Sequence, residues 1–120
     1  MLLVEFWCAG CGRQPKMLEI DESYDGREVD INVGDVAEVK LAENPTTGYR
    51  WVFASKPEPV CQVADDSFEP GGTASGAGGT HRWKFEAVSS GTGAVKLGYR
   101  RPWEKNAAAG QTFTLNIRVR

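Results

Sequence analysis

Histidine and cysteine are scarce in this sequence of 120 residues, and their scarcity excludes several chemistries. The single histidine, His81, rules out a His-rich metal site. Three cysteines are an odd number, so they cannot form a complete disulfide framework. Cys8 and Cys11 make one CxxC without a second pair or a nearby His, which argues against zinc, and the βαβ pattern of a thioredoxin-like site is missing. No metal and no other cofactor is predicted.

The sequence also lacks a long apolar run and a large net charge. No run approaches the roughly 18 apolar residues that would span a bilayer, so no membrane span is predicted. Fourteen basic side chains stand against sixteen acidic ones, which leaves a formal charge of −2 and no electrostatic footprint for nucleic acid. Two local arginine pairs, Arg100 with Arg101 and Arg118 with Arg120, are interpreted as solvated.

The N-terminus differs in character from the rest of the sequence. Its first twelve residues, MLLVEFWCAGCG, are apolar, and Cys8-Ala9-Gly10-Cys11 partly resembles a bacterial lipoprotein cleavage site, with Cys11 as the lipidated residue. A signal needs a basic start and a longer apolar region, whereas no basic residue precedes Arg13 and Glu5 interrupts the run. Residues 1–16 are therefore either a truncated export signal or a tail. We expect an exported protein (periplasmic, lipid-anchored or secreted), and a cytoplasmic one stays open.

Apolar and polar residues alternate with a period of two in many segments of the sequence. From Thr112 to Val119 every odd position is apolar and every even one polar, which is typical of a half-buried strand. No segment of ten or more residues carries a helical apolar stripe. Gly and Pro, 14 and six in number, supply turns between the strands. The pattern predicts one all-β domain, an antiparallel β-sandwich of seven to eight strands. The further candidate strands are 29–33, 37–41, 51–53, 60–63, 81–87 and 95–99.

The segment Asn44-Pro45-Thr46-Thr47-Gly48-Tyr49 is more elaborate than a turn requires. Pro fixes its own φ and pushes the preceding Asn toward extended backbone, the two Thr restrict χ1, and Gly permits a turn that other residues make poorly. We expect a stiff, pre-shaped loop that presents small hydroxyl groups.

Two later segments are also unusual. Gly76-Ala77-Gly78-Gly79 leads into a strand rather than a helix, which argues against a phosphate-binding P-loop. Close approach of its backbone to a partner is favoured instead. Arg100-Arg101-Pro102-Trp103 places an aromatic side chain after a Pro in a loop, and Trp and Arg are enriched among interface hot spots.

The ordered set NPTTGY, GAGG and RPW resembles the motifs of the chagasin family of cysteine-peptidase inhibitors. The resemblance covers residues 17–120. It implies an immunoglobulin-like sandwich whose three loops occlude the cleft of papain-like cysteine peptidases, reversibly and without a covalent bond. Thr46 and Thr47 would approach the catalytic centre of the peptidase, Gly76 to Gly79 would contact one flank, and Arg101 with Trp103 would pack on the other, held by Pro102. A monomer is expected, because the loops must stay free.

Two other functions have some basis in the sequence. For an enzyme, Cys61 and His81 are the only candidate nucleophile pair, but Cys61 lies among apolar residues and His81 is interpreted as an ordinary residue at the end of a strand. The acidic residues Asp65, Asp66 and Glu69 do not match a calcium loop and are interpreted as a solvated loop. The alternative that stays open is a carbohydrate- or peptide-binding adhesion module, in which Trp103 and Tyr49 would stack on a ligand.

Overall fold

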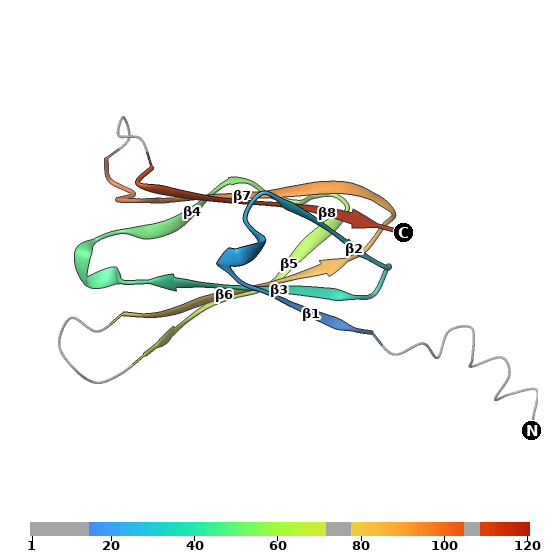
Figure 1. The fold of residues 1–120 in the computed structure, drawn as a ribbon, viewed down its shortest axis with the longest axis horizontal. Helices are drawn as coiled ribbons and strands as arrows, with labels where there is room; N and C mark the ends of the chain where they lie inside the picture. Colours follow the sequence, from blue (N-terminus) through green and yellow to red (C-terminus); the bar gives the residue numbers. More distant parts are fainter. Residues whose placement is uncertain (1–14, 72–77, 105–108) are drawn as a thin grey trace, which may run out of the picture.

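Two four-stranded β-sheets face one another in the computed structural model, which describes residues 15–71, 78–104 and 109–120 (Figure 1). The strand order is β1-β3-β6-β5 in one sheet and β2-β8-β7-β4 in the other. The strands are β1 (Met17–Ile20), β2 (Arg27–Ile31), β3 (Val36–Glu43), β4 (Arg50–Ser55), β5 (Cys61–Pro70), β6 (Gly79–Ala87), β7 (Gly91–Arg100) and β8 (Gln111–Val119). Two short 3-10 helices, η1 (Glu22–Tyr24) and η2 (Pro45–Thr47), complete the elements.

The alternating residues of the sequence form the core between the sheets. In β8 the apolar residues Phe113, Leu115 and Ile117 are at most 2% exposed, and from the facing sheet Trp83 and Phe85 pack against them at 1% and 0%. Each such side chain contributes about 1.5–3 kcal/mol through burial. The predicted all-β sandwich is confirmed, and with eight strands it has the upper number of the predicted range.

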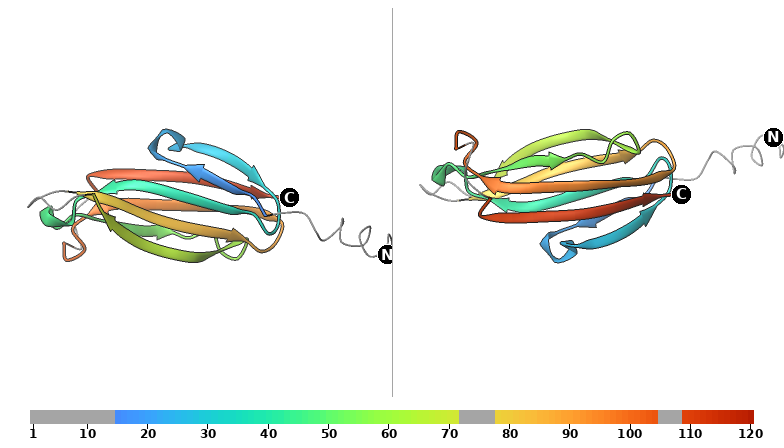
Figure 2. Two further views of the ribbon diagram at one scale, coloured as in Figure 1. Left: turned by 90° about the horizontal axis from the view of Figure 1, so that it is seen from below. Right: turned by 90° about the horizontal axis from the view of Figure 1, so that it is seen from above.

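Two edge pairings are parallel, which the alternation did not predict. β1 pairs with β3 and β2 pairs with β8 in parallel register, and the other four pairings are antiparallel. Between β1 and β2 the chain crosses from one sheet to the other at η1 (Figure 2). Asp21 caps η1, where hydrogen bonds from the hydroxyl and the backbone N–H of Ser23 lower the pKa of its carboxyl. β1 has only four residues, too few for its alternation to stand out in the sequence.

The strand β5 corrects two interpretations. It runs for ten residues instead of the predicted 60–63, so the acidic residues Asp65, Asp66 and Glu69 lie in a strand and not in a loop. Their cross-strand partners are in β6, and Arg82 of that strand forms an ion pair with Glu69 at 2.9 Å. His81 is likewise the third residue of β6 and not its end. Pairing with a neighbouring strand outweighs the low β-propensity of Asp and Glu here.

Three connections lie together at one end of the sandwich: β3 to β4, β5 to β6, and β7 to β8 (Figures 1 and 2). The C-terminus and the start of β1 lie at the opposite end. Because the strands run up and down between the two ends, every second connection of the chain from β3 onward falls on the same end. Within the part of the chain that the structure describes, no helix has the length and apolar character needed to cross a membrane.

Candidate functional site

The loop between β3 and β4 is held in shape by its own side chains. Asn44 Oδ1 accepts a hydrogen bond from Thr46 N at 3.2 Å, and the hydroxyl of Thr47 donates to the carbonyl of Asn44 at 2.8 Å. The same hydroxyl accepts from Tyr49 N at 3.3 Å. Gly48 follows η2 with φ +84°, a left-handed conformation that glycine adopts without strain. The expected stiff loop is present, and the hydroxyls of Thr46 and Thr47 take part in bracing it.

The β7–β8 connection lies against this loop. Trp103 remains 66% exposed, yet the end of its indole lies so close to Gly48 that a Cβ added there would stand 2.5 Å from Cη2 of the ring. The guanidinium carbon of Arg101 lies 4.7 Å from the centre of the Tyr49 ring. Pro102 is exposed between them, and an ion pair of Arg101 with Glu104 at 3.5 Å bridges the turn. The two motifs therefore form one surface.

Beneath this surface an aromatic cluster joins the loop to the sandwich. The Tyr99 ring lies 5.4 Å from the Tyr49 ring and 4.9 Å from the Trp51 ring, centre to centre. The hydroxyl of Tyr99 accepts a hydrogen bond from Asn44 N at 2.9 Å, and Trp51 Nε1 donates to the carbonyl of Ala42 at 2.9 Å. These contacts fix where the loop leaves β3 and where it enters β4.

The glycine-rich connection reaches the same end. Gly71 N donates to the carbonyl of Gly78 at 2.9 Å and closes the base of that connection. A Cβ added at Gly78 would lie 3.2 Å from the carbonyl oxygen of Glu43 and 3.5 Å from Cβ of Asn44, so only a residue without a side chain fits easily. Gly76 and Ala77, which the resemblance also places at the site, lie outside the described residues. A hollow of about 540 Å³ lies among the three connections, lined by Ala42, Glu43, Asn44, Gly71, Gly78, Gly79, Thr80, Tyr99 and Gln111.

A charged network under the loop was not foreseen from the sequence. Glu43 is 2% exposed, and its Oε2 accepts a hydrogen bond from Trp51 N at 2.8 Å. Its Oε1 lies 3.0 Å from Nδ1 of His81, and Nε2 of His81 contacts Oδ1 of Asp66. The sequence did contain a signal for this network. Val39 and Leu41 point inward, so alternation also points the next odd residue, Glu43, inward. A charge at an inward position needs a partner.

The family model described as "Chagasin family peptidase inhibitor I42" matches residues 30–117. The chain belongs to the chagasin family. It is 31% identical over 106 residues to chagasin of Trypanosoma cruzi, with 84% of this chain and 96% of that protein aligned. It is 35% identical over 104 residues to amoebiasin-1 of Entamoeba histolytica, which covers 85% of this chain and 99% of that protein.

The solved structures agree with this assignment. The crystal structure of a cysteine protease inhibitor from Entamoeba histolytica superposes with a TM-score of 0.77 and 26% identity, and the match covers 91% of this chain and all of that one. As a chagasin-family protein, the chain is an inhibitor of cysteine peptidases and not an enzyme.

The one described cysteine of this chagasin-family chain has no catalytic setting. Cys61 is fully buried, and burial raises the pKa of its thiol to about 11. It pairs across the strands with Ala87, whereas His81 lies six residues away along β6, roughly 20 Å at the rise of a strand. The Cys61–His81 pair therefore does not form, and Cys61 is the small buried hydrophobe that was expected. Cys8 and Cys11 lie outside the described residues.

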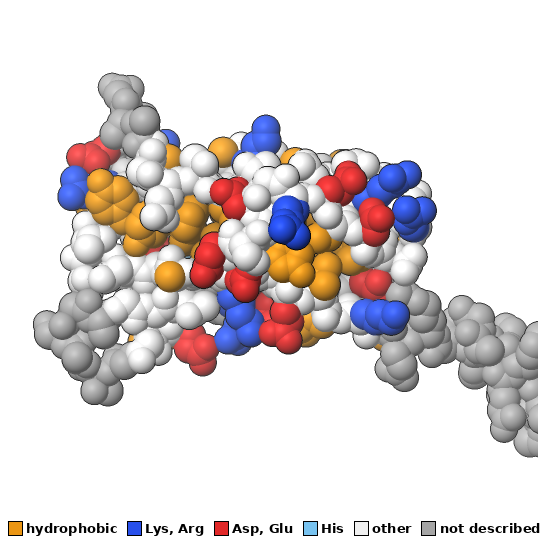
Figure 3. Space-filling view, viewed as in Figure 1, with side chains coloured by type: hydrophobic (Ala, Val, Ile, Leu, Met, Phe, Trp, Pro, Cys, Tyr) orange, Lys and Arg blue, Asp and Glu red, His pale blue; other side chains and the backbone are white. Residues whose placement is uncertain are grey.

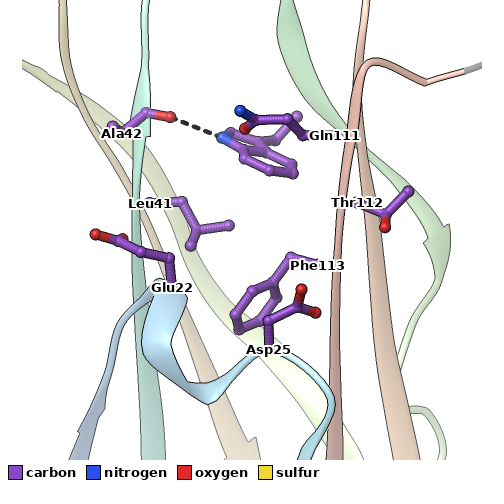
Figure 4. Close-up of a pocket in the computed structure, with 8 residues that line it drawn as sticks. Glu22, Asp25, Leu41, Ala42, Gln111, Thr112 and Phe113 are labelled. Atoms are coloured by element: carbon purple, nitrogen blue, oxygen red, sulfur yellow. Dashed lines mark hydrogen bonds between the residues drawn. The ribbon is translucent and has the colours of Figure 1, made fainter.

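A second cavity of the inhibitor, of about 440 Å³, lies between β3 and β8 beside η1 (Figure 4). Leu41 and Phe113 line its apolar wall, and Glu22 and Asp25 line it from η1 and the turn that follows. Trp51, the second residue of β4 after the loop, also lines it. Figure 3 shows hydrophobic side chains at the surface in two places on this face, near the middle and at the loop end, among interspersed charges. The cavity thus lies behind the loop base and not among the loops.

Proposed function

We propose that this protein inhibits papain-like cysteine peptidases reversibly, by placing its three connections in the active-site cleft. The observation that supports this most directly is the exposed indole of Trp103 braced against Gly48. An aromatic side chain that is exposed but held from behind loses little entropy on binding, which is the property of an interface anchor. The membership in a family of peptidase inhibitors supplies the class of partner.

The Asn44–Tyr49 loop is proposed to enter the cleft at the catalytic centre. A peptidase cuts when a substrate carbonyl reaches its thiolate with the oxyanion hole in line. The internal hydrogen bonds of Thr46 and Thr47 hold this loop in a 3-10 turn, a conformation unlike the extended backbone of a substrate. The loop can fill the cleft without presenting a peptide bond for attack, so the inhibitor should leave the complex uncleaved.

The other two connections are proposed to contact the cleft walls. Gly78 and Gly79 offer backbone groups on one side, while Trp103 packs on the other. Arg101 is proposed to contribute partly through Tyr49, because its guanidinium lies over that ring. Three loop tips are compatible with an interface of standard size, roughly 1,600 Å² in total. A monomer suits this mode of binding, since its loops stay free.

The aromatic contacts weigh against the carbohydrate-binding alternative. A sugar-binding site needs open aromatic faces, but the Tyr49 ring already contacts the Arg101 guanidinium and the Tyr99 ring. Of Tyr49 and Trp103, only Trp103 is open, at 66% exposure. The geometry fits a shaped protein-binding surface better than a stacking platform for a sugar.

Titration of papain with the purified protein tests the proposal. We expect a stoichiometric loss of activity that dilution reverses, and an intact inhibitor by mass spectrometry afterwards. Replacement of Thr46 and Thr47 by Phe should weaken inhibition at least a hundredfold, because bulky side chains enlarge the loop tip that must enter the cleft. Absence of inhibition of papain and of a panel of related peptidases at micromolar concentration would exclude the proposed function, and binding to a carbohydrate array would then favour the alternative.

A further inference from the structure

The two ends of the Asn44–Tyr49 loop are joined through a buried carboxylate. Glu43 is the last residue of β3, directly before the loop, and Trp51 is the second residue of β4, directly after it. Oε2 of Glu43 accepts the backbone hydrogen bond of Trp51 N at 2.8 Å, and the side chain of Glu43 is 1% exposed. One side chain therefore closes the base of the loop.

The other carboxylate oxygen of Glu43 is held by His81. Nδ1 of His81 lies 3.0 Å from Oε1 of Glu43, and Nε2 contacts the carboxylate of Asp66. The imidazole stacks on the indole of Trp83, with ring centres 4.0 Å apart and planes inclined by 8°. Since Trp83 is 1% exposed in the core, this stacking fixes the ring between the two carboxylates.

We propose that Glu43, His81 and Asp66 form a proton-dependent clamp that positions the inhibitory loop. The role of this clamp in inhibition rests on the function proposed above. A neutral imidazole carries one N–H and can donate to one carboxylate only. Here both ring nitrogens face carboxylate oxygens, so the complete network needs a ring with a proton on each nitrogen. When the ring loses one proton, one of the two contacts loses its donor.

Apart from Glu43 and Asp66, the charged side chains around His81 lie away from its ring. Alternation along the strands places the nearby charges of the same sheet on its outer face, where Arg82 forms ion pairs with Glu38 and Glu69. That outer face also carries Glu19 on β1, Lys40 on β3, Lys84 and Glu86 on β6 and Asp65 on β5. The facing sheet contributes the titratable Tyr99, whose hydroxyl accepts from Asn44 N, and Lys56 lies over the Phe53 ring at 5.5 Å. Glu43 and Asp66 are thus the carboxylates that contact His81.

A pH effect on the loop follows from this geometry. The doubly protonated ring donates to both carboxylates, so the clamp contributes its full free energy in that form. The singly protonated ring lacks one of the two donors, and acidic solution favours the form that has both. Loss of one charge-assisted hydrogen bond reduces the closed population of the loop base by about tenfold. We expect the loop to be most strongly pre-organised at acidic pH.

Amide hydrogen exchange of the free protein tests the clamp without a peptidase. The protection factor of Trp51 N–H, corrected for intrinsic exchange, should fall about tenfold between pH 5 and pH 8 in the wild type. In His81→Gln and in Glu43→Gln it should be low at both pH values. Glu69→Gln, a carboxylate change on the outer face of the same sheet, is the matched control and should behave like the wild type. The amide of Leu115, in the core strand β8, reports global unfolding and should keep its protection throughout.

Asp66→Asn keeps the test decisive if the buried variants fail to fold, because the side chain of Asp66 is 49% exposed. It should reduce the pH dependence at Trp51 while Leu115 is unchanged. A wild-type protection factor at Trp51 that does not vary with pH, or an identical pH profile in Asp66→Asn, would overturn the clamp. Peptidase titration separates the two proposals: a clamp without inhibition overturns the proposed function, and inhibition with a pH-independent Trp51 amide overturns the clamp alone.

Discussion

The indole of Trp103 lies against the Cα of Gly48, at a distance that leaves no room for a side chain on that glycine. The two residues come from the first and third of the three connections at the loop end, which carry the motifs NPTTGY and RPW. Their contact turns two separate loops into one rigid surface. It also makes the glycine necessary for two reasons, its positive φ and the indole beside it.

Gly48→Ala should weaken peptidase inhibition strongly. The new methyl group strains the backbone at φ +84° by about 1–2 kcal/mol and displaces the indole, since a Cβ would stand 2.5 Å from Cη2 of Trp103. We expect at least a tenfold loss of affinity for papain, measured by competition with a fluorogenic substrate. Gly26→Ala is the matched control, because Gly26 has φ +81° with nothing within 4 Å of an added Cβ. This variant should be less stable than the wild type but should keep its affinity for papain. Equal affinities of the two variants would contradict the role of the contact.

Trp103→Ala should weaken inhibition and leave the fold intact. The indole is 66% exposed, so its removal costs little stability, whereas an aromatic anchor is worth about 2–4 kcal/mol at an interface. Affinity for papain should fall by a factor of about thirty to a thousand, with a melting temperature within a few degrees of the wild type. Val33→Ala, which truncates a 47%-exposed apolar side chain between β2 and β3, should leave the affinity unchanged. A similar loss in both variants would argue against a specific anchor.

Tyr99→Phe should loosen the inhibitory loop without disturbing the core. The variant keeps the ring contacts with Tyr49 and Trp51 but removes the acceptor of the Asn44 backbone N–H. Loss of this hydrogen bond costs about 1 kcal/mol, so we expect a several-fold loss of affinity and faster exchange of the Asn44 amide. Tyr24→Phe removes a hydroxyl at η1 and serves as the control. An unchanged Asn44 amide would show that the hydroxyl does not hold the loop.

The thiol of Cys61 should resist alkylation in the folded protein. Burial raises its pKa to about 11 from an ordinary value of 9.0, so at pH 8 only about one thiol in a thousand is ionised. In a chain with Cys8 and Cys11 changed to Ser, iodoacetamide should react at Cys61 only after unfolding in guanidinium, as measured by mass spectrometry. Because the folded pKa is the higher one, stability falls only as the pH rises above the ordinary thiol value. Rapid alkylation of the native protein at pH 8 would contradict this burial.

The strands were predictable where burial on one face repeats over many residues. Phe113, Leu115 and Ile117 alternate with polar neighbours, and this local pattern is enough to predict a strand and its inward face. The same rule failed for β5, whose acidic residues are stabilised by partners on β6 that no local pattern reveals. It also passed over β1, which pairs in parallel with β3 at the edge of its sheet.

The sequence by itself determined the fold class, the family and the shape of the Asn44–Tyr49 loop, because alternation, turn residues and local hydrogen bonds act between near neighbours in the chain. Only the tertiary structure decided which side chains support that loop. Tyr99, His81 and Asp66 are distant from it in sequence, and they reach it because their strands pair or face one another across the sandwich. Such contacts depend on strand order and register, which are properties of the whole domain and not of any segment.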